Sequence, residues 1–243
     1  MKKTLVLGAS GATGSLLVRQ LLENNFNVVA ILRPASSLMP LVAAQPNYQE
    51  IKAEISETDA ETLAEYVVDC EVVFSCLGHN LTLKGIFGNP RNLVTESVTK
   101  LSRAIELSKP DHKLKFILMN TTGNANRDIA EKPPWSQRLV IALIRLLIPP
   151  HADNEKAADY LRLTIGQNHP VIEWAAVRPD GLIDENEVTS YEVLESPSRN
   201  VIFNAGSTSR LNVANFMARL AIEEKLWKKW RGKMPVIYNS DQS

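Results

Sequence analysis

The sequence contains little cysteine, no excess charge of either sign and no long hydrophobic run. Its two cysteines, Cys70 and Cys76, flank one short apolar segment and offer neither a disulfide framework nor the spacing of a metal site, which fits a reducing cytosol. Lysine plus arginine number 27, as do aspartate plus glutamate, which argues against a basic surface for nucleic acid or an anionic membrane. The longest apolar run, residues 139–148, is interrupted by Arg145 and is too short to cross a bilayer. We therefore expect a cytoplasmic protein without a metal, nucleic-acid or membrane partner.

What the sequence does contain is a glycine-rich segment close to its start. Gly8, Gly11 and Gly14 follow the apolar run 5–7, and residues 15–23 carry apolar side chains at helical spacing. A strand, a tight turn and a helix in this order direct backbone N–H groups of the helix N-terminus at a bound phosphate. Glycines permit the sharp exit from the strand, the close approach of a pyrophosphate and the close packing of the helix on the sheet. The pattern favours dinucleotide binding over a turn whose glycines serve packing alone.

The second predicted strand, residues 27–32, ends in Arg33, with Ser36 and Ser37 just beyond it. In a dinucleotide-binding fold the residue at this position meets the adenosine ribose. An acidic residue would bond the 2′-hydroxyl of NAD, whereas an arginine suits the 2′-phosphate of NADP. Arg33 therefore favours NADP (NADPH) as the cofactor, although a solvated arginine at a strand end would give the same sequence.

Strands and helices alternate along the first half of the chain. The apolar patterns predict strands over 5–7, 27–32, 48–51, 70–77 and 113–119, and helices over 15–23, 58–66 and 92–107. Short connections between them predict an α/β fold, a doubly wound parallel-sheet Rossmann fold, in a single NAD(P)-binding domain over residues 1–243. Ligands of such a sheet bind beyond the carboxyl ends of its strands. That rule gathers at one rim residues 8–13, 33, 54, 75–79 and 120–123.

The second half of the chain is expected to form a small C-terminal substrate-side extension, mainly residues 124–150 and 180–210. An apolar helix is predicted over Trp135 to Ile148, closed by Pro149 and Pro150. Its apolar side chains cover more than one face, so the helix is either buried or a homodimer or protein-partner contact, or it forms a lid or wall for an apolar substrate; oligomerisation and substrate shielding do not exclude each other. The rest of the pattern predicts a helix over 153–166 with Asp153 or Asn154 as its N-cap, a strand over 171–177, short strands over 187–194, 200–203 and 235–238, and a helix over 211–222.

Several segments together resemble a known family. They are G-A-S-G-A-T-G at 8–14, Arg33-Pro34, F-S-C-L-G at 74–78, R-P-D-G-L at 178–182 and T-S-R-L-N-V-A-N-F-M at 208–217. The chain resembles the atypical short-chain dehydrogenases/reductases, in particular the NmrA-like branch of NAD(P)H-binding proteins, which includes the B-type biliverdin/flavin reductases. The resemblance implies that the pyrophosphate is lined by Gly8, Ser10, Gly11, Ala12, Thr13 and Gly14. It implies further that Arg33 holds the 2′-phosphate, that Glu54 and Ile55 flank the adenine, and that Leu77 and Gly78 lie under the ribose. Asn120, at the end of the fifth strand, completes the expected cofactor-binding set.

The catalytic Tyr-x-x-x-Lys pair of that superfamily is missing from the corresponding helix. His151 stands near the position of the tyrosine and Glu155 near that of the lysine. The literal match, Tyr48 to Lys52, falls on a predicted strand, where the two residues are about 13 Å apart and cannot act together.

Three residues are therefore candidates for the catalytic steps. His151 either donates a proton or serves as a helix N-terminal cap, and His79, after the fourth strand, is expected near the substrate pocket. Thr121 either orients a carbonyl or the nicotinamide amide, or caps the strand end. Flavins, quinones and other conjugated acceptors can take their proton from water, so the missing pair does not prevent hydride transfer. We expect an NADPH-dependent oxidoreductase of a small or conjugated acceptor; the alternative is a non-catalytic NAD(P)-binding redox sensor of the NmrA type.

Overall fold

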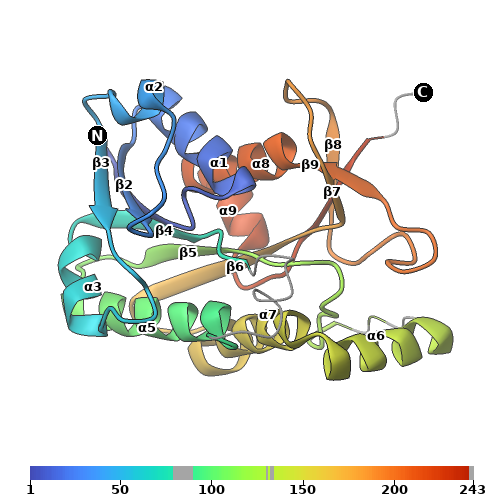
Figure 1. The fold of residues 1–243 in the computed structure, drawn as a ribbon. Coiled ribbons are helices and arrows are strands. Elements are labelled where there is room, and N and C mark those ends of the chain that lie inside the picture. The colour runs from blue at the N-terminus through green and yellow to red at the C-terminus, as the bar shows by residue number, and fades with distance from the viewer. Residues whose placement is uncertain (79–89, 130, 132–133, 241–243) are drawn as a thin grey trace.

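The fold is built on one mostly parallel sheet, seen in a computed structural model that describes residues 1–78, 90–129, 131 and 134–240, with only the backbone of residues 138 and 146. The sheet has eight strands in the order β3-β2-β1-β4-β5-β6-β10-β8. Along the chain they are β1 (Lys3–Leu7), β2 (Asn27–Leu32), β3 (Tyr48–Lys52), β4 (Cys70–Ser75), β5 (Leu114–Met119), β6 (Ile172–Pro179), β8 (Tyr191–Leu194) and β10 (Val236–Asn239). Because β1 lies between β2 and β4, the strand order reverses at its carboxyl end, which is where such sheets bind ligands (Figure 1).

Helices cover both faces of this sheet. α1 (Ala12–Glu23), α8 (Arg210–Ile222) and α9 (Glu224–Trp230) lie on one face, and α3 (Ala60–Val67), α5 (Leu93–Ser108) and α7 (Pro149–Asp159) lie on the other (Figure 1). Successive side chains of a strand point to opposite faces, so Val6 of β1 belongs to one hydrophobic core and its neighbours Leu5 and Leu7 belong to the other. The two cores confirm the predicted doubly wound α/β fold.

The far edge of the sheet differs from the prediction. β10 is parallel to β6, but β8 pairs antiparallel with β10. β7 (Gly181–Ile183) and β9 (Ser207–Ser209) form a separate two-stranded parallel sheet. The strand predicted over 200–203 is wrong, because these residues form a turn, and the short helices α2 (Pro40–Ala43) and α9 were not predicted. Segments of three to seven residues are too short for their hydrophobic period to be read reliably.

The two prolines at 149 and 150 begin a helix rather than closing one. α6 (Trp135–Leu147) is followed after a single residue by α7, which starts with both prolines. Proline fits there because the first N–H groups of a helix have no intrahelical partner. α7 continues as a π-helix over Tyr160–Ile165 up to Gly166. None of the described helices, α6 included, has the length and apolarity needed to cross a membrane.

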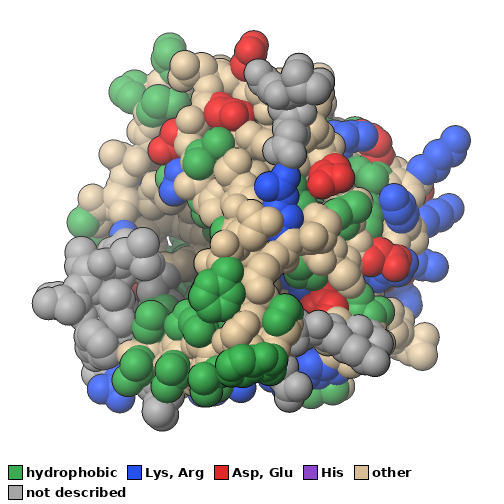
Figure 2. Space-filling model, turned by 90° about the vertical axis from the view of Figure 1, so that its right-hand side faces the viewer, with side chains coloured by type: hydrophobic (Ala, Val, Ile, Leu, Met, Phe, Trp, Pro, Cys, Tyr) green, Lys and Arg blue, Asp and Glu red, His purple; other side chains and the backbone are tan. Residues whose placement is uncertain are grey.

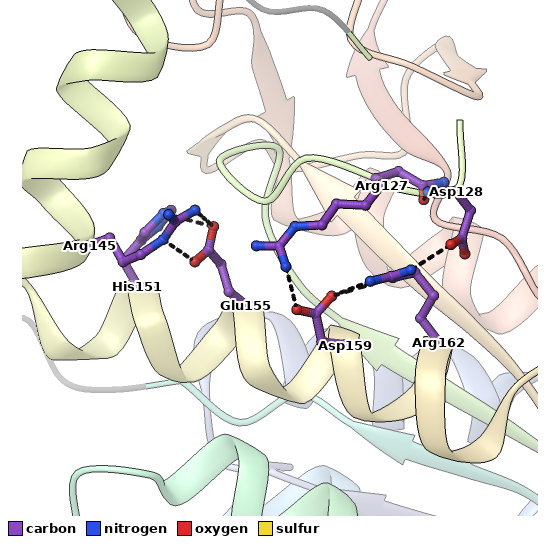
Figure 3. A network of polar contacts seen from close by, with 8 residues as sticks. Arg127, Asp128, Arg145, His151, Glu155, Asp159 and Arg162 are labelled. Carbon is purple, nitrogen blue, oxygen red and sulfur yellow. Dashed lines mark hydrogen bonds and ion pairs between the residues drawn. The ribbon is translucent and has the colours of Figure 1, made fainter. Parts of the chain in front are cut away.

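The prediction that Asp153 or Asn154 caps its own helix is also wrong, because α7 begins at Pro149 and both residues lie inside it. The Asp153 carboxylate accepts hydrogen bonds from the backbone N–H groups of Val94, at 2.8 Å, and Thr95, at 3.0 Å, so it caps α5 instead. The side chain is buried, and the Thr95 hydroxyl donates to it as well. This contact fixes the rotation of α7 against α5 and directs the other side of α7 toward the loop that follows β5 (Figure 3).

Candidate active site

The glycine turn after β1 leaves an open helix N-terminus. Gly8 has a positive φ of 78°, and a Cβ there would lie 2.7 Å from the carbonyl carbon and oxygen of Cys76 at the end of β4. The Gly11 N–H donates to the Gly8 carbonyl at 3.0 Å, and α1 then begins at Ala12 with no side-chain cap. Free N–H groups at the start of a twelve-residue helix form an anion-binding site.

Gly14 sets the distance between α1 and this turn. A Cβ at Gly14 would lie 2.2 Å from the Gly8 carbonyl oxygen, well inside any contact distance. Within the turn Gly11 and Ala12 are exposed and Ser10 is half-buried, whereas Thr13 is buried. The accessible backbone therefore lies in the middle of the turn, where the sequence predicts the pyrophosphate.

Two cations lie beyond the neighbouring strands. Arg33 directly follows β2 and is exposed, and no hydrogen bond or ion pair engages its guanidinium within the described parts of the chain. Lys52 ends β3 in register with Leu32; its amine bonds the Ser36 carbonyl and lies 2.8 Å from the Glu50 carboxylate. Lys52 was not predicted as a site residue, because in the sequence it belongs to a Tyr-x-x-x-Lys match that falls on a strand. A lysine that ends the strand beside β2 was the signal.

The other predicted cofactor residues border the same rim. Gly78 is exposed, and a Cβ there would touch no described atom; Leu77 before it is half-buried against the core. Glu54 is half-buried and Ile55 is buried. The open helix terminus, the glycines that let the turn pack closely and the exposed Arg33 together fit a dinucleotide. His79 lies outside the described residues.

Asn120 joins the end of β5 to α7. Its amide donates to the Asn154 carbonyl at 3.0 Å, and its side-chain oxygen accepts the Thr121 N–H at 2.8 Å and a hydrogen bond from Asn124. The side chain is buried and bonded through both of its polar atoms. These hydrogen bonds fix the junction between the end of β5 and α7 and so position the residues that follow Asn120. A contact of Asn120 with the cofactor stays a prediction.

The structure brings two of the predicted catalytic residues together at this junction. A Cβ on Gly123 would lie 3.1 Å from Cε1 of His151 and 3.6 Å from the hydroxyl oxygen of Thr121. The Thr121 hydroxyl also accepts the Gly123 N–H at 3.2 Å. Gly123 therefore makes room for the His151 ring beside Thr121.

His151 is held in its neutral form. Burial lowers the pKa of His151, and Arg145 lowers it as well, while Glu155 acts in the opposite direction. Its Nε2 atom is buried and has no hydrogen-bond partner among the described residues; Oε1 of Glu155 lies 3.8 Å away. The lowered pKa favours the neutral imidazole near pH 7, and within the described part of the chain its buried Nε2 has no hydrogen-bond partner.

A cavity of about 1370 Å³ opens beside this junction. Thr122 and Gly123 line it at the end of β5, Trp135 and Leu139 line it on α6, and residues 196–200 close the opposite side. Trp135 is 79% exposed and Leu139 57% exposed, so the apolar wall remains open to solvent. Figure 2 shows hydrophobic side chains gathered along α6 at the lower edge of this face.

Arg178, at the end of β6, ties the walls of the cavity together. Its fully buried guanidinium donates to the carbonyl groups of Asn124, Glu195 and Met234 at 2.7–3.0 Å. It also pairs with the buried carboxylate of Glu131 at 2.7 Å. This role of Arg178 was not predictable from the sequence, where the residue stands out only within the R-P-D-G-L motif, because none of its partners is close to it along the chain.

Ion pairs along α7 and its π-helical continuation support the same wall (Figure 3). They are Arg145–Glu155, Arg127–Asp159 and Arg162–Asp128. Each pair joins residues from different parts of the chain, so sequence spacing gave no sign of them. Together they hold α6 and the loop after β5 against α7.

Comparisons with known proteins agree with this site. A family model described as NAD(P)H-binding matches residues 8–224. Averufin oxidase A of Aspergillus flavus is 24% identical over 208 residues, which cover 80% of this chain and 70% of that protein. A wide-type short-chain dehydrogenase/reductase from Veillonella parvula, solved with NADP, has a TM-score of 0.69 at 16% identity, covering 99% of this chain and 95% of that one. ChuY, an anaerobillin reductase from Escherichia coli O157:H7, has a TM-score of 0.66 at 16% identity, and the match covers 100% of this chain and 99% of that one.

The family match begins at the first glycine of the turn and reaches the start of α9. It therefore includes the anion-binding terminus of α1, the β5–α7 junction and the cavity walls in one unit. The solved structures show the same fold over nearly the whole chain. The protein belongs to the NAD(P)H-binding family.

Proposed function

We propose that this protein is an NADPH-dependent reductase that passes a hydride to a small or conjugated acceptor, such as a flavin, a quinone or a carbonyl compound. The observation that carries the proposal is the position of the cavity. It begins at Thr122 and Gly123 beyond β5, on the same edge of the sheet as the glycine turn beyond β1. A dinucleotide lying across that edge would reach from Arg33 to the mouth of the cavity.

The chain's own residues have separable tasks in this scheme. When bound, the coenzyme would supply the hydride; the N–H groups at the start of α1 would hold its pyrophosphate, and Arg33 and Lys52 would hold its adenosine end. Trp135 and Leu139 provide an apolar wall that orients the acceptor and excludes water from one side. Gly123 lines the cavity, and Thr121 and His151 lie next to it; we assign their hydroxyl and imidazole to hydrogen bonds with the acceptor.

Two of the similar proteins are named for redox reactions, averufin oxidase A and the anaerobillin reductase. Their names support redox chemistry for this chain. The open apolar wall supports an acceptor with an extended ring system, because a flat apolar molecule would cover the exposed side chains of α6.

A non-catalytic redox sensor is the second candidate. Leu143 and Leu147 of α6 are 49% and 61% exposed and do not line the cavity. A protein partner or a second copy of the chain that covers them would suit a sensor.

Coenzyme oxidation separates the two candidates. NADPH consumption is followed with flavins, quinones and aldehydes in turn, and we expect multiple turnovers with at least one of them. Tight coenzyme binding without turnover on every acceptor would favour the sensor.

Replacing Arg33 tests the preference for NADPH. Arg33→Asp should weaken NADPH binding about 10- to 100-fold, because a charge-assisted hydrogen bond is worth about 1.5–3 kcal/mol. NADH binding should change little, and Arg103→Asp, an exposed arginine on α5, should change neither. Equal losses for the two coenzymes would remove the case for a 2′-phosphate site.

A further inference from the structure

His151 and Glu155 form an incomplete pair on one face of α7. They are four residues apart, and Nε2 of His151 lies 3.8 Å from Oε1 of Glu155, too far for a hydrogen bond. The Nε2 atom is buried without a partner among the described residues, and the His151 side chain is only 11% exposed. Buried polar atoms are normally hydrogen-bonded. The unbonded Nε2 of His151, one helical turn from the Glu155 carboxylate, therefore indicates a hydrogen bond that has still to form.

Arg145 of α6 keeps that contact from forming. Its Nε and Nη2 atoms bind the two oxygens of Glu155 at 2.5 and 2.7 Å, in a bidentate pair (Figure 3). Of the charged groups in the described structure, Glu155 on α7 and Arg145 on α6 are the ones that act on His151. Thr121 and Gly123, which pack against its ring from β5, carry no charge. The carboxylate of Asp159, which is paired with Arg127, also raises the pKa of Arg145.

Arg145 is accessible from the cavity. Arg145 and Glu155 both line it, and Arg145 is 46% exposed while Glu155 is 12% exposed. In the described structure Nη1 of Arg145 donates no hydrogen bond, since the pair with Glu155 uses Nε and Nη2. Arg127 and Arg199 also line the cavity, whereas its other carboxylate, Glu131, is tied to Arg178. The cavity thus offers positive charge beside an apolar wall.

We propose that the acceptor is an amphipathic acid whose carboxylate or phosphate binds Arg145, and that Glu155, once released, bonds Nε2 of His151 and makes it the proton donor. This deepens the proposed reductase function and rests on it. The acceptor is reduced by the hydride of NADPH, which becomes NADP⁺. The Nδ1–H bond of His151, on the side of the ring that faces Gly123, breaks, and its proton forms the new O–H or N–H bond on the acceptor, while Nε2–H stays bonded to the Glu155 carboxylate. Water returns a proton to the ring after the product leaves.

The arrangement explains why His151 is neutral in the free protein. Burial and Arg145 lower the pKa of His151, whereas a direct bond to the Glu155 carboxylate would raise it. Arg145 is therefore a positioning residue that links acceptor binding to the charge of His151. The proton donor becomes charged when an acid occupies the cavity.

The test needs no substrate, because Arg145→Gln should release Glu155 by itself. The titration midpoint of His151 is measured by NMR, its signal assigned by its loss in His151→Asn. We expect the midpoint to rise by about one pH unit or more in Arg145→Gln, and the rise to disappear when Glu155→Gln is added. Arg127→Gln, which breaks the next ion pair along α7, is the matched control and should leave the midpoint unchanged. An unchanged midpoint in Arg145→Gln, or a rise that survives Glu155→Gln, would overturn the proposal.

Two probe pairs then test the acceptor class. FMN and riboflavin share one ring system and differ by a phosphate, and benzoate and benzamide differ by the carboxylate charge. We expect at least one acid to raise the His151 midpoint as Arg145→Gln does, to bind about tenfold tighter than its neutral partner, and to lose this advantage in Arg145→Gln. A phosphate-specific or carboxylate-specific response identifies the group. Equal effects of acid and neutral partner, or no effect of either acid, would refute the assignment.

These outcomes are separable from failure of the reductase. NADPH oxidation by neutral acceptors without any His151 response would leave the reductase standing and refute the anion-linked switch. A His151 response without coenzyme oxidation would support the switch in a protein that is not a reductase.

Discussion

Replacing Arg178 tests whether the cavity walls depend on one buried cation. Arg178→Met keeps the apolar length of the side chain but removes its hydrogen bonds to the carbonyls of Asn124, Glu195 and Met234. It also leaves the Glu131 carboxylate buried without its partner. Breaking a buried pair in this way costs about 3–5 kcal/mol. Since 1 kcal/mol shifts Tm by about 2–4 °C for a chain of this length, we expect Tm to fall by about 6–20 °C.

The assay is thermal and urea unfolding of a matched set of variants. Adding Glu131→Gln to Arg178→Met should recover about 0.5–3 kcal/mol, because the uncompensated charge is gone. Arg103→Met removes an arginine that is 60% exposed and paired with Glu106, and should change stability by less than about 0.5 kcal/mol. A cost below about 1 kcal/mol for Arg178→Met, or no recovery in the double variant, would show that Arg178 does not hold the walls.

Two further predictions concern the turn and the imidazole. Gly14→Ala should lower NADPH affinity at least about tenfold, because the added Cβ would push α1 away from the Gly8 carbonyl. The control Ser15→Ala removes an exposed hydroxyl that bonds only within its own helix turn and should leave the affinity unchanged. Calorimetric titration of both variants measures the difference. Because the pKa of His151 is lower in the folded than in the unfolded chain, the unfolded chain takes up its proton first as the pH falls from about 7 through the folded-state pKa, and stability is lost over that interval. His151→Gln should therefore lose less Tm than the wild type on acidification, and an equal loss would contradict the neutral, buried imidazole.

The fold was predictable because its signals are local. The apolar runs of β1, β2, β4 and β5 are each followed by a residue typical of strand ends, namely Gly8, Pro34, Gly78 and Asn120. The glycines at 8, 11 and 14 mark the first turn. The errors lie where one residue type serves two roles. Pro149 can end one helix or begin the next, and in this chain it begins α7. Asp153 can cap its own helix or another, and it caps α5.

The candidate site was predictable only in part, for the same reason. The proximity of Thr121 and His151 could be expected because each follows or opens a regular element, and the topology brings those ends together; their catalytic roles stay predictions. Lys52, Arg145 and Arg178 take their roles from partners on other elements, such as the Ser36 carbonyl, the Glu155 carboxylate and the Met234 carbonyl. Contacts of this kind depend on packing, which spacing along one sequence does not reveal.

The central claim is that a nicotinamide dinucleotide lies across the amino end of α1. NADPH titration followed by the backbone amide signals of the protein tests it most directly. We predict saturable binding with the largest shifts at the N–H groups of residues 11–14, and smaller shifts at Arg33 and Gly78. Absence of binding, or shifts confined to residues away from this turn, would contradict the account.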